Sequence, residues 1–339
     1  MPIVSILIPT YNEEAHVEDC LRSVRAFSVP AGTQVEILII DGMSTDRTRE
    51  IVAQIASSDS GVRLIDNPDR FQSAALNRGI REAQGDYILR LDAHSFYPPD
   101  YLERCLETAT RTNADNTGGI VRTMRRGERY QARLVQALIT HRFGVGNSGF
   151  RTDAPEGPAD TVPYGFFRRD VFDRVGYFDE RLVRAQDYEM NRRIISKGGK
   201  IWRNPRIHLD YFPQPDFKSF IRKQFVYEAP YNAYMWHVAP YSFALRHAIT
   251  AVFAAGVILG LILSPFSSLV RTVFSGVMLL YAFLAILSAI SQAMRYKDAR
   301  HVLFLPFAFF LYHFLHGLGV IIGLVRLATH TAPVQARPA

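Results

Sequence analysis

Cysteine is scarce in this sequence, and basic residues are nowhere concentrated. Only Cys20 and Cys105 occur in 339 residues, which leaves neither a disulfide framework nor a Cys-x-x-Cys metal site. We therefore expect most of the chain to lie in a reducing compartment. The net charge of +7 and the pI of about 9.4 favour an anionic partner such as a nucleotide, a diphosphate or an anionic membrane. The absence of a dense Lys/Arg block argues against nucleic acid.

Charged residues are missing from three long segments near the C-terminus. No Asp, Glu, Lys or Arg occurs in residues 248–264, 272–294 and 302–325. These lengths predict three transmembrane spans in a membrane domain at 243–330. Core helices of a soluble domain are the alternative, but burying three successive uncharged runs would need a very large core.

The loops between these segments differ in charge. Residues 295–300 carry three basic residues and one acid, whereas the preceding loop carries only Arg271. The positive-inside rule then predicts a multi-pass protein of the inner (plasma) membrane, with the 295–300 loop and the large N-terminal region in the cytoplasm.

Strand and helix patterns alternate over residues 1–125. The predicted strands are 4–8, 35–40, 62–65 and 87–91, and the predicted helices between them are 14–26, 48–56 and 74–83. This order predicts an α/β fold with a parallel sheet and helices on both faces. Further helices are predicted at 126–143, 168–175 and 187–197, with a long Gly/Pro/Asp-rich loop at 144–160 of a kind that is often functional.

Polar side chains follow three of the predicted strands. The segments are PTYNEE (9–14), DGMSTD (41–46) and DAH (92–94). Parallel strands end at one edge, so Asp41, Asp92 and His94 are expected to share a crevice suited to a nucleotide and a divalent metal. The alternatives are a cap for the helix near Thr48, a turn at Asp41, a loop acid at Asp92 and a surface histidine at His94.

Four motifs in order, PTYNEE, DGMSTDRT, LDAH and QDYEMNRR, resemble the family 2 inverting glycosyltransferases with the GT-A fold. The segments GVGNSGFR and DTVPYGFFRRDVFDRVGYFDERL resemble the succinoglycan-biosynthesis glucosyltransferases in particular. The resemblance covers residues 1 to about 235. It implies a GT-A nucleotide-diphospho-sugar transferase domain with a mostly parallel central sheet. Residues 1–125 would form its nucleotide-sugar-binding half and 126–235 its acceptor-binding and catalytic half, with interfacial helices.

The same resemblance assigns roles to individual residues. Those expected at the nucleotide sugar are Pro9, Thr10, Tyr11, Glu13, Asp41, which would bond the base, and Asp92. Those expected to line the sugar and acceptor pocket are Tyr164, Gly165 and Phe166. Asp92 and His94 occupy the position of the family's DXD metal motif, and the imidazole favours Mn²⁺ over Mg²⁺.

Asp187 matches the acid that acts as general base in this family, and Glu189 is its rival. A helix start lowers the pKa of such an acid and burial raises it, and the sequence leaves that balance open. As general base, the acid would take the proton of the acceptor hydroxyl while the nucleotide diphosphate leaves with inversion.

The implied function is a membrane-anchored, metal-dependent transferase. It would move a hexose, glucose from UDP-glucose, to a polyprenyl-diphosphate-linked saccharide in exopolysaccharide biosynthesis. The Q-x-x-R-W stretch of processive synthases is replaced by RKQFVY at 222–227, which favours the addition of one sugar. The alternatives are a polyprenyl-phosphate sugar synthase and a non-catalytic nucleotide-sugar-binding scaffold of a membrane complex.

Overall fold

The computed structural model of the chain describes residues 1–125, 127–152 and 154–331. Contacts divide the described residues into two compact units. Unit 1 comprises Met1–Arg122 and the described part of Asp153–Tyr211, and unit 2 comprises the described parts of Thr123–Thr152 and Phe212–Val334. The division does not follow the functional halves expected from the sequence, because residues 127–152 group with the C-terminal helices. It does not bear on which half binds donor or acceptor, so those halves stay predictions.

The strands form one eight-stranded sheet in the order β3-β2-β1-β4-β7-β5-β8-β6. Its strands are β1 (Ile3–Thr10), β2 (Gln34–Asp41), β3 (Val62–Asp66), β4 (Tyr87–Arg90), β5 (Asn116–Thr123), β6 (Gly157–Pro158), β7 (Phe166–Arg168) and β8 (Ile201–Tyr211). The first four are parallel, as predicted, and they pair in the order of a doubly wound sheet. The register places Thr10 beside Asp41 and Leu7 beside Arg90, so β1, β2 and β4 end at one edge.

The second half of the sheet was not predicted. β7 pairs antiparallel with both β4 and β5, and β6 pairs antiparallel with β8. The predicted helix at 168–175 is wrong at its start, because Arg168 lies in β7 and the helix begins at Asp170. Phe166 and Phe167 supply the buried strand residues there, and the segment is too short for a period to be read from sequence.

Helices cover both faces of the sheet in unit 1. They are α1 (Val17–Arg25), α2 (Thr48–Ser58), α3 (Gln72–Glu82), α4 (Tyr101–Thr112), α7 (Asp170–Val175) and α8 (Gln186–Ser196). On one face, Leu7 and Leu38 belong to a core cluster that includes Leu76 of α3, Phe172 of α7 and Met190 of α8. On the other face, alternate strand residues such as Ile6, Ile8 and Ile39 are fully buried. The sheet is therefore covered on both faces, and its strands can present polar side chains to a ligand only at their ends.

Unit 2 consists of helices. They are α5 (Tyr130–Ile139), α6 (Arg142–Val145), α9 (Phe217–Arg222), the π-helix η1 (Lys223–Glu228), α10 (Ala229–Val238), the 3₁₀ turn η2 (Pro240–Ser242), α11 (Leu245–Leu263), α12 (Ser268–Tyr296) and α13 (Arg300–Ala328). The single helix predicted at 126–143 is two helices with a break at Thr140 and His141. The Nδ1 atom of His141 accepts a hydrogen bond from the backbone N–H of Phe143 (3.1 Å) and so begins the second helix.

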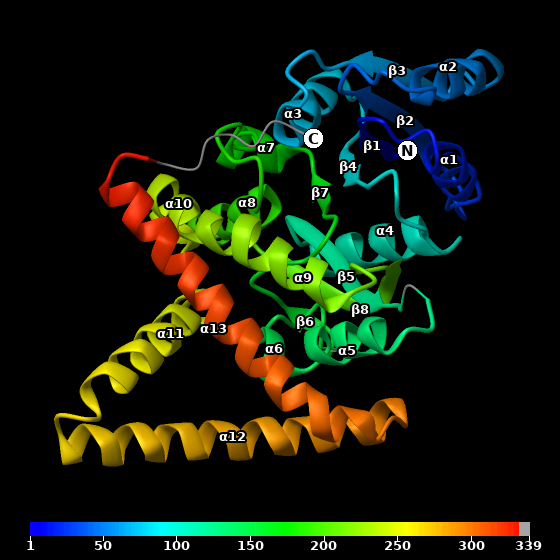
Figure 1. Cartoon of the computed structure of the whole chain (residues 1–339). Coiled ribbons are helices and arrows are strands. Elements are labelled where there is room, and N and C mark those ends of the chain that lie inside the picture. The colour runs from blue at the N-terminus through cyan, green and yellow to red at the C-terminus, as the bar shows by residue number, and fades with distance from the viewer. Residues whose placement is uncertain (126, 153, 332–339) are drawn as a thin grey trace. The chain divides into compact units, whose positions relative to one another are not determined.

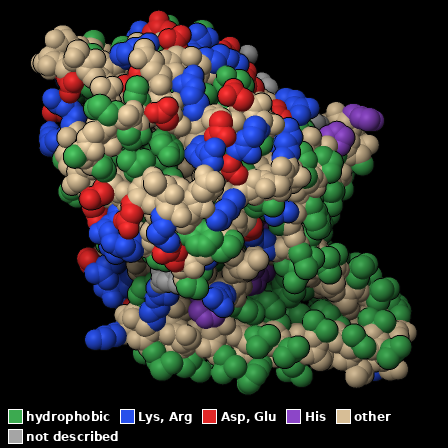
Figure 2. All heavy atoms as spheres, turned by 180° about the vertical axis from the view of Figure 1, so that it is seen from behind, with side chains coloured by type: hydrophobic (Ala, Val, Ile, Leu, Met, Phe, Trp, Pro, Cys, Tyr) green, Lys and Arg blue, Asp and Glu red, His purple; other side chains and the backbone are tan. Residues whose placement is uncertain are grey.

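Three helices of unit 2, α11, α12 and α13, are long and apolar enough to cross a membrane. They extend the predicted spans by a few residues at most ends, because helical hydrogen bonding continues into the flanking polar residues. Hydrophobic side chains cover the lower part of the surface in Figure 2, where α12 lies in Figure 1. Leu269 and Leu279 of α12 and Phe307 of α13 are each more than 70% exposed, as expected for side chains that face lipid.

The helix α5 packs within unit 2 against the ends of α12 and α13 that flank the 295–300 loop. Tyr130 contacts His301 (Oη–Nδ1 3.3 Å), and Thr140 contacts Tyr296 (Oγ1–Oη 2.9 Å). The amide of Gln292 in α12 also donates to the carbonyl of Ala137 (2.5 Å). The loop with the excess of basic residues therefore lies on the same side of the spans as α5.

Candidate functional site

The loops that follow β1 and β2 are tied together by hydrogen bonds. The side-chain oxygen of Asn12 accepts a hydrogen bond from the backbone N–H of Thr45 (2.8 Å), and the backbone N–H of Asn12 donates to Ser44 Oγ (2.9 Å). The N–H of Glu13 donates to Thr48 Oγ1 (2.7 Å). Asn12 and Met43 adopt left-handed backbone conformations, with φ of +53° and +61°. The PTYNEE and DGMSTD motifs thus form one structure at the edge where the parallel strands end.

Asp41 lies at the centre of this structure and has no exposed surface. Its Oδ1 accepts from Ser44 Oγ (2.5 Å) and Thr10 Oγ1 (3.3 Å). Its Oδ2 accepts from the N–H of Ser44 (2.9 Å) and from Arg49 (2.8 Å). A carboxylate offers about four lone pairs, and protein donors occupy all four here. The base contact expected of Asp41 stays a prediction, and it requires one of these bonds to be exchanged.

The structure also bears on the alternative interpretation of the DGMSTD motif, in which it caps the helix near Thr48. Asp46 Oδ1 accepts from the N–H (3.0 Å) and the hydroxyl (2.6 Å) of Thr48, so Asp46 supports the start of α2. Asp46 and Asp41 therefore both help to join the loops after β1 and β2, whereas the acid after β4 has a different environment.

Asp92 follows β4. One of its carboxylate oxygens has protein partners, and the other has none among the described residues. Its Oδ1 binds Arg90 (2.8 Å) and accepts from Gln72 Nε2 (3.1 Å). Among the described residues, nothing donates to its Oδ2. His94 is exposed, and its Nδ1 lies 3.1 Å from Glu13 Oε1. This hydrogen bond from the imidazole to Glu13 raises the pKa of His94.

The atoms of Asp92 and His94 left without partners among the described residues, a carboxylate oxygen and an imidazole nitrogen, are of the types that bind divalent metals. Glu13 holds Nδ1 of His94 and leaves Nε2 available, which is the usual arrangement when a carboxylate orients a metal-binding histidine. The part of the chain that the structure describes contains no group of three or more His, Cys, Asp or Glu residues suited to a metal. Remaining ligands would then come from nucleotide oxygens and water. Glu13 contacts the candidate metal ligand His94, and its expected contact with the nucleotide stays a prediction.

Asp187, in the first turn of α8, lies next to the same group of residues. Its Oδ2 is 3.2 Å from a terminal nitrogen of Arg90, and about a third of its side chain (33%) is exposed. Burial raises the pKa of Asp187, Arg90 opposes the rise and Asp92 adds to it. The balance that the sequence left open is thus decided in favour of a raised pKa. Its Oδ1 accepts no hydrogen bond from any described residue.

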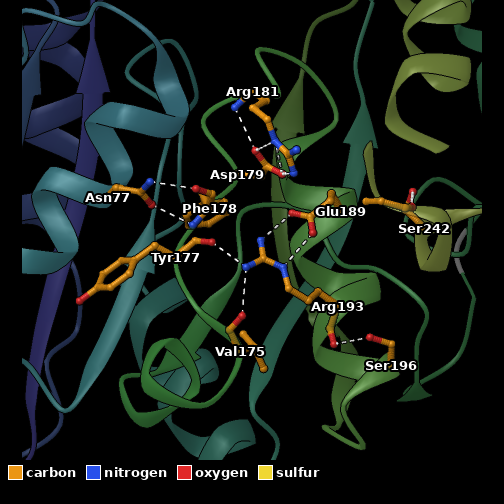
Figure 3. A network of polar contacts seen from close by, with 11 residues as sticks. Asn77, Val175, Tyr177, Phe178, Asp179, Arg181, Glu189, Arg193, Ser196 and Ser242 are labelled. Carbon is orange, nitrogen blue, oxygen red and sulfur yellow. Dashed lines mark hydrogen bonds and ion pairs between the residues drawn. The ribbon is translucent and has the colours of Figure 1, made fainter. Parts of the chain in front are cut away.

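Glu189, the rival base, is occupied by an ion pair. It is fully buried, and its two carboxylate oxygens lie 2.8 and 2.7 Å from the guanidinium of Arg193. Arg193 also donates to the carbonyls of Val175 (3.1 Å) and Tyr177 (2.7 Å), as Figure 3 shows. Glu189 therefore joins α8 to the end of α7 and has no surface to offer a substrate.

The residues expected in the sugar and acceptor pocket lie close to Arg90 but are mostly enclosed. The ring of Tyr164 lies under the guanidinium of Arg90 (4.9 Å), and the carbonyl of Gly165 accepts from the N–H of Arg90 (3.1 Å). A Cβ at Gly165 would lie 2.3 Å from the ring of Phe167, so glycine is required there. Phe166 is 1% exposed and stacks on Tyr87 (5.0 Å), which makes it a core residue in this structure.

An open hollow of about 340 Å³ lies at the start of α3. It is lined by Asp69, Phe71, Ala74, Glu180 and Arg181, from the start of α3 and the loop before α8. Asn77 fixes that loop by bonding both the N–H (2.8 Å) and the carbonyl (2.9 Å) of Phe178, as Figure 3 also shows. The hollow is of the size that holds a sugar-sized ligand.

Three residues of this site were missed by sequence reasoning. Arg90, Gln72 and Gln186 connect the predicted acids, and Gln186 Nε2 donates to Gln72 Oε1. Arg90 did leave a signal, because it interrupts an otherwise apolar strand at a position where a charge needs a partner. The two glutamines left none.

Comparison with known proteins identifies the class. The model of the family described as "Glycosyl transferase family 2" matches residues 5–176, and the chain therefore belongs to that family. The chain is similar to the succinoglycan biosynthesis protein ExoA of Rhizobium meliloti (strain 1021), with 34% identity over 224 residues, 66% of this chain and 67% of the relative. This relationship and the family match confirm the resemblance noted in the sequence.

A second relative is a dolichyl N-acetyl-alpha-D-glucosaminyl phosphate 3-beta-D-2,3-diacetamido-2,3-dideoxy-beta-D-glucuronosyltransferase of Methanococcus voltae. It is 30% identical over 68% of this chain and 73% of its own length. An undecaprenyl-phosphate 4-deoxy-4-formamido-L-arabinose transferase of Pseudomonas aeruginosa (strain LESB58) is 32% identical over 42% of this chain and 43% of its own length.

Among solved structures, the mannosyltransferase PcManGT from Pyrobaculum calidifontis in complex with GDP-Man and Mn²⁺ is similar, with a TM-score of 0.58 and 16% identity. The match covers 96% of this chain and 87% of that one. It confirms the GT-A fold.

Proposed function

We propose that this chain is a membrane-anchored, inverting and non-processive glycosyltransferase. It transfers a hexose, glucose from UDP-glucose, to a polyprenyl-diphosphate-linked saccharide in exopolysaccharide biosynthesis. The observation that carries the proposal is the meeting of Asp92 and Asp187 on Arg90 at the edge where β1 and β4 end. One acid follows a strand of the donor half and the other begins a helix far along the chain, as a donor site facing an acceptor site requires.

The roles of the two acids follow from their free atoms. Asp187 accepts the proton of the acceptor hydroxyl at Oδ1, while Arg90 holds Oδ2. The hydroxyl oxygen bonds to the anomeric carbon as the bond to the nucleotide diphosphate breaks, which inverts that carbon. Asp92 Oδ2 and His94 Nε2 would hold Mn²⁺ or Mg²⁺, which neutralises the charge of the leaving diphosphate. The other proposed contacts of the nucleotide are Pro9, Thr10, Tyr11, Glu13 and Asp41.

A lipid-linked acceptor is supported by the C-terminal helices and by the relatives. Three candidate spans follow the transferase domain. The positive-inside rule places the basic 295–300 loop in the cytoplasm, and with three spans the N-terminal region then lies there too. The relative from Methanococcus voltae is named for a sugar attached to a dolichyl phosphate. An acceptor of the same kind at the inner membrane fits this chain.

A second candidate is a polyprenyl-phosphate sugar synthase, which attaches the sugar directly to the lipid phosphate. The undecaprenyl-phosphate transferase relatives favour it, although they match only 42% of this chain. The two candidates differ only in the acceptor, so one assay separates them. A non-catalytic scaffold is disfavoured, because Asp92 and Asp187 are both present and both retain a free oxygen.

The test is a transfer assay on the full-length protein in membranes or nanodiscs. Labelled UDP-glucose, UDP-galactose, UDP-N-acetylglucosamine and GDP-mannose are each offered with undecaprenyl phosphate or with extracted lipid-linked saccharides. We expect transfer from UDP-glucose to the lipid-linked saccharide only, one sugar per acceptor by mass, with the anomeric centre inverted by NMR.

Transfer to undecaprenyl phosphate alone would establish the second candidate. Addition of several sugars per acceptor would contradict the non-processive assignment. Binding of UDP without transfer to either acceptor, unchanged in Asp187→Asn, would leave the scaffold as the remaining explanation.

A further inference from the structure

Arg90 is a buried arginine that joins two acids from distant parts of the chain. It is the last residue of β4, and 6% of its side chain is exposed. One terminal nitrogen lies 2.8 Å from Asp92 Oδ1 and the other lies 3.2 Å from Asp187 Oδ2. The planar guanidinium fork can hold two carboxylates in fixed directions, which an ammonium group cannot do.

Protein groups also close the other sides of Arg90. Its face lies over the ring of Tyr164 (4.9 Å), and its backbone N–H donates to the carbonyl of Gly165 (3.1 Å). Its Nε is buried and has no hydrogen-bond partner among the described residues. A guanidinium so enclosed is not placed to receive the diphosphate of a donor, so its role is directed at the two acids.

The contacts continue around a closed circuit, which we name the polar ring. Asp92 Oδ1 accepts from Gln72 of α3 (3.1 Å), and Gln72 accepts from Gln186. Gln186 is buried and directly precedes Asp187 in α8, and Asp187 returns to Arg90. Members of β4, α3 and α8 are thus linked, so that the first turn of α8 is fixed relative to the end of β4.

We propose that Arg90 is a positioning residue that fixes Asp187 relative to Asp92 through the polar ring, and so aligns the acceptor hydroxyl with the donor sugar. The inference rests on the proposed function for the roles of the two acids. Its physical basis is that transfer in line depends on the angle and distance of the attacking oxygen. A displacement of about 1 Å in such a site lowers the rate by about 100-fold.

The test compares Arg90→Met, Arg90→Lys, Asp187→Asn and the double variant Arg90→Met/Asp187→Asn in the full-length protein. The control is Arg174→Met, because Arg174 also pairs with two carboxylates, Asp115 and Asp170, but lies in α7 away from the site. The measurements are kcat and KM for transfer, UDP affinity by calorimetry, and the unfolding temperature.

For Arg90→Met we expect kcat to fall by about 100-fold while donor KM and UDP affinity change by less than about 3-fold. Arg90→Lys keeps the charge but not the fork, so we expect it to regain only part of kcat. Because Arg90 acts through Asp187, the double variant should be no slower than Asp187→Asn alone. Arg174→Met should lower the unfolding temperature and leave kcat unchanged.

Several outcomes overturn the inference. Loss of UDP affinity in Arg90→Met would make Arg90 a diphosphate ligand. An unchanged kcat in folded Arg90→Met, or losses that multiply in the double variant, would remove its action through Asp187. If Arg90→Met does not fold, Arg90→Lys carries the test, and full activity in that variant contradicts the inference. If Asp187→Asn keeps its kcat, the general-base assignment of the proposed function is wrong. That result can be told apart from a failure of the positioning role of Arg90, which is measured in the Arg90 variants.

Discussion

The sharpest distinction that the structure makes is between two acids in the first turn of one helix, Asp187 and Glu189. Asp187 is one-third exposed and has a free oxygen, whereas Glu189 is fully buried against Arg193. The variants Asp187→Asn and Glu189→Gln should therefore fail in opposite ways. Loss of a general base lowers kcat by about 10²–10⁴-fold, and that is the effect expected for Asp187→Asn, with folding intact.

Glu189→Gln should lose stability instead. Removing one partner of a buried ion pair costs about 3–5 kcal/mol, because it leaves the other charge, here Arg193, buried and uncompensated. For a unit of this size that corresponds to an unfolding temperature lower by about 10 °C. Its kcat per folded molecule, measured well below that temperature, should stay within about 3-fold of the unaltered protein.

The assay measures unfolding by fluorescence and transfer on the same nanodisc samples. A Glu189→Gln protein with an unchanged unfolding temperature and no turnover would refute the reasoning and make Glu189 the base. An undiminished kcat in Asp187→Asn would also refute the reasoning.

Three further predictions concern the metal, the pH dependence and the candidate spans. Burial raises the pKa of Asp187, and a general base must be deprotonated to act. We therefore expect kcat to fall as the pH drops through a pKa above the ordinary aspartate range. An acidic fall in kcat centred at or below that range would contradict this prediction. Removal of divalent metal with EDTA should abolish transfer, and His94→Asp should shift the preference from Mn²⁺ toward Mg²⁺ when each ion is added back; transfer that survives chelation excludes the metal. A Cβ at Gly323 of α13 would lie 2.4 Å from the carbonyl of Pro230, whereas one at Gly256 of α11 meets nothing within 4 Å, so Gly323→Ala should lower the unfolding temperature in detergent and Gly256→Ala should not; equal effects would count against the packing described.

The fold could be predicted where the signal is local. The four parallel strands and the three apolar segments were identified because each carries its own periodicity or length. β7 could not be predicted in this way. It has three residues, and its place between β4 and β5 depends on pairing across the chain rather than on a pattern within Phe166–Arg168. For the same reason, Phe166 was expected at a pocket and lies in the core.

In the candidate site, too, local sequence patterns could be recognised, whereas contacts between distant segments could not. Asp92 and His94 could be proposed as site residues because a strand that ends in polar residues is visible in the sequence itself. The contact of Arg90 with Asp187 spans two segments with no shared pattern, so only the fold reveals it. The family resemblance favoured Asp187 over Glu189, but the burial of Glu189 against Arg193 could not be read from the sequence, because two acids in the same turn of a helix differ only in the side they face.

The bonds already made by the three strand-edge and helix acids indicate which of them can take part in chemistry. Asp41 spends all of its lone pairs on Thr10, Ser44 and Arg49, so its present role is to hold the two loops that would surround a nucleotide. Asp92 and Asp187 each give one oxygen to Arg90 and keep the other free. In the proposed mechanism, the shared arginine thus leaves one free carboxylate oxygen for the donor and one for the acceptor. That is the number required by a reaction in which a metal-bound diphosphate leaves as a single hydroxyl proton is removed.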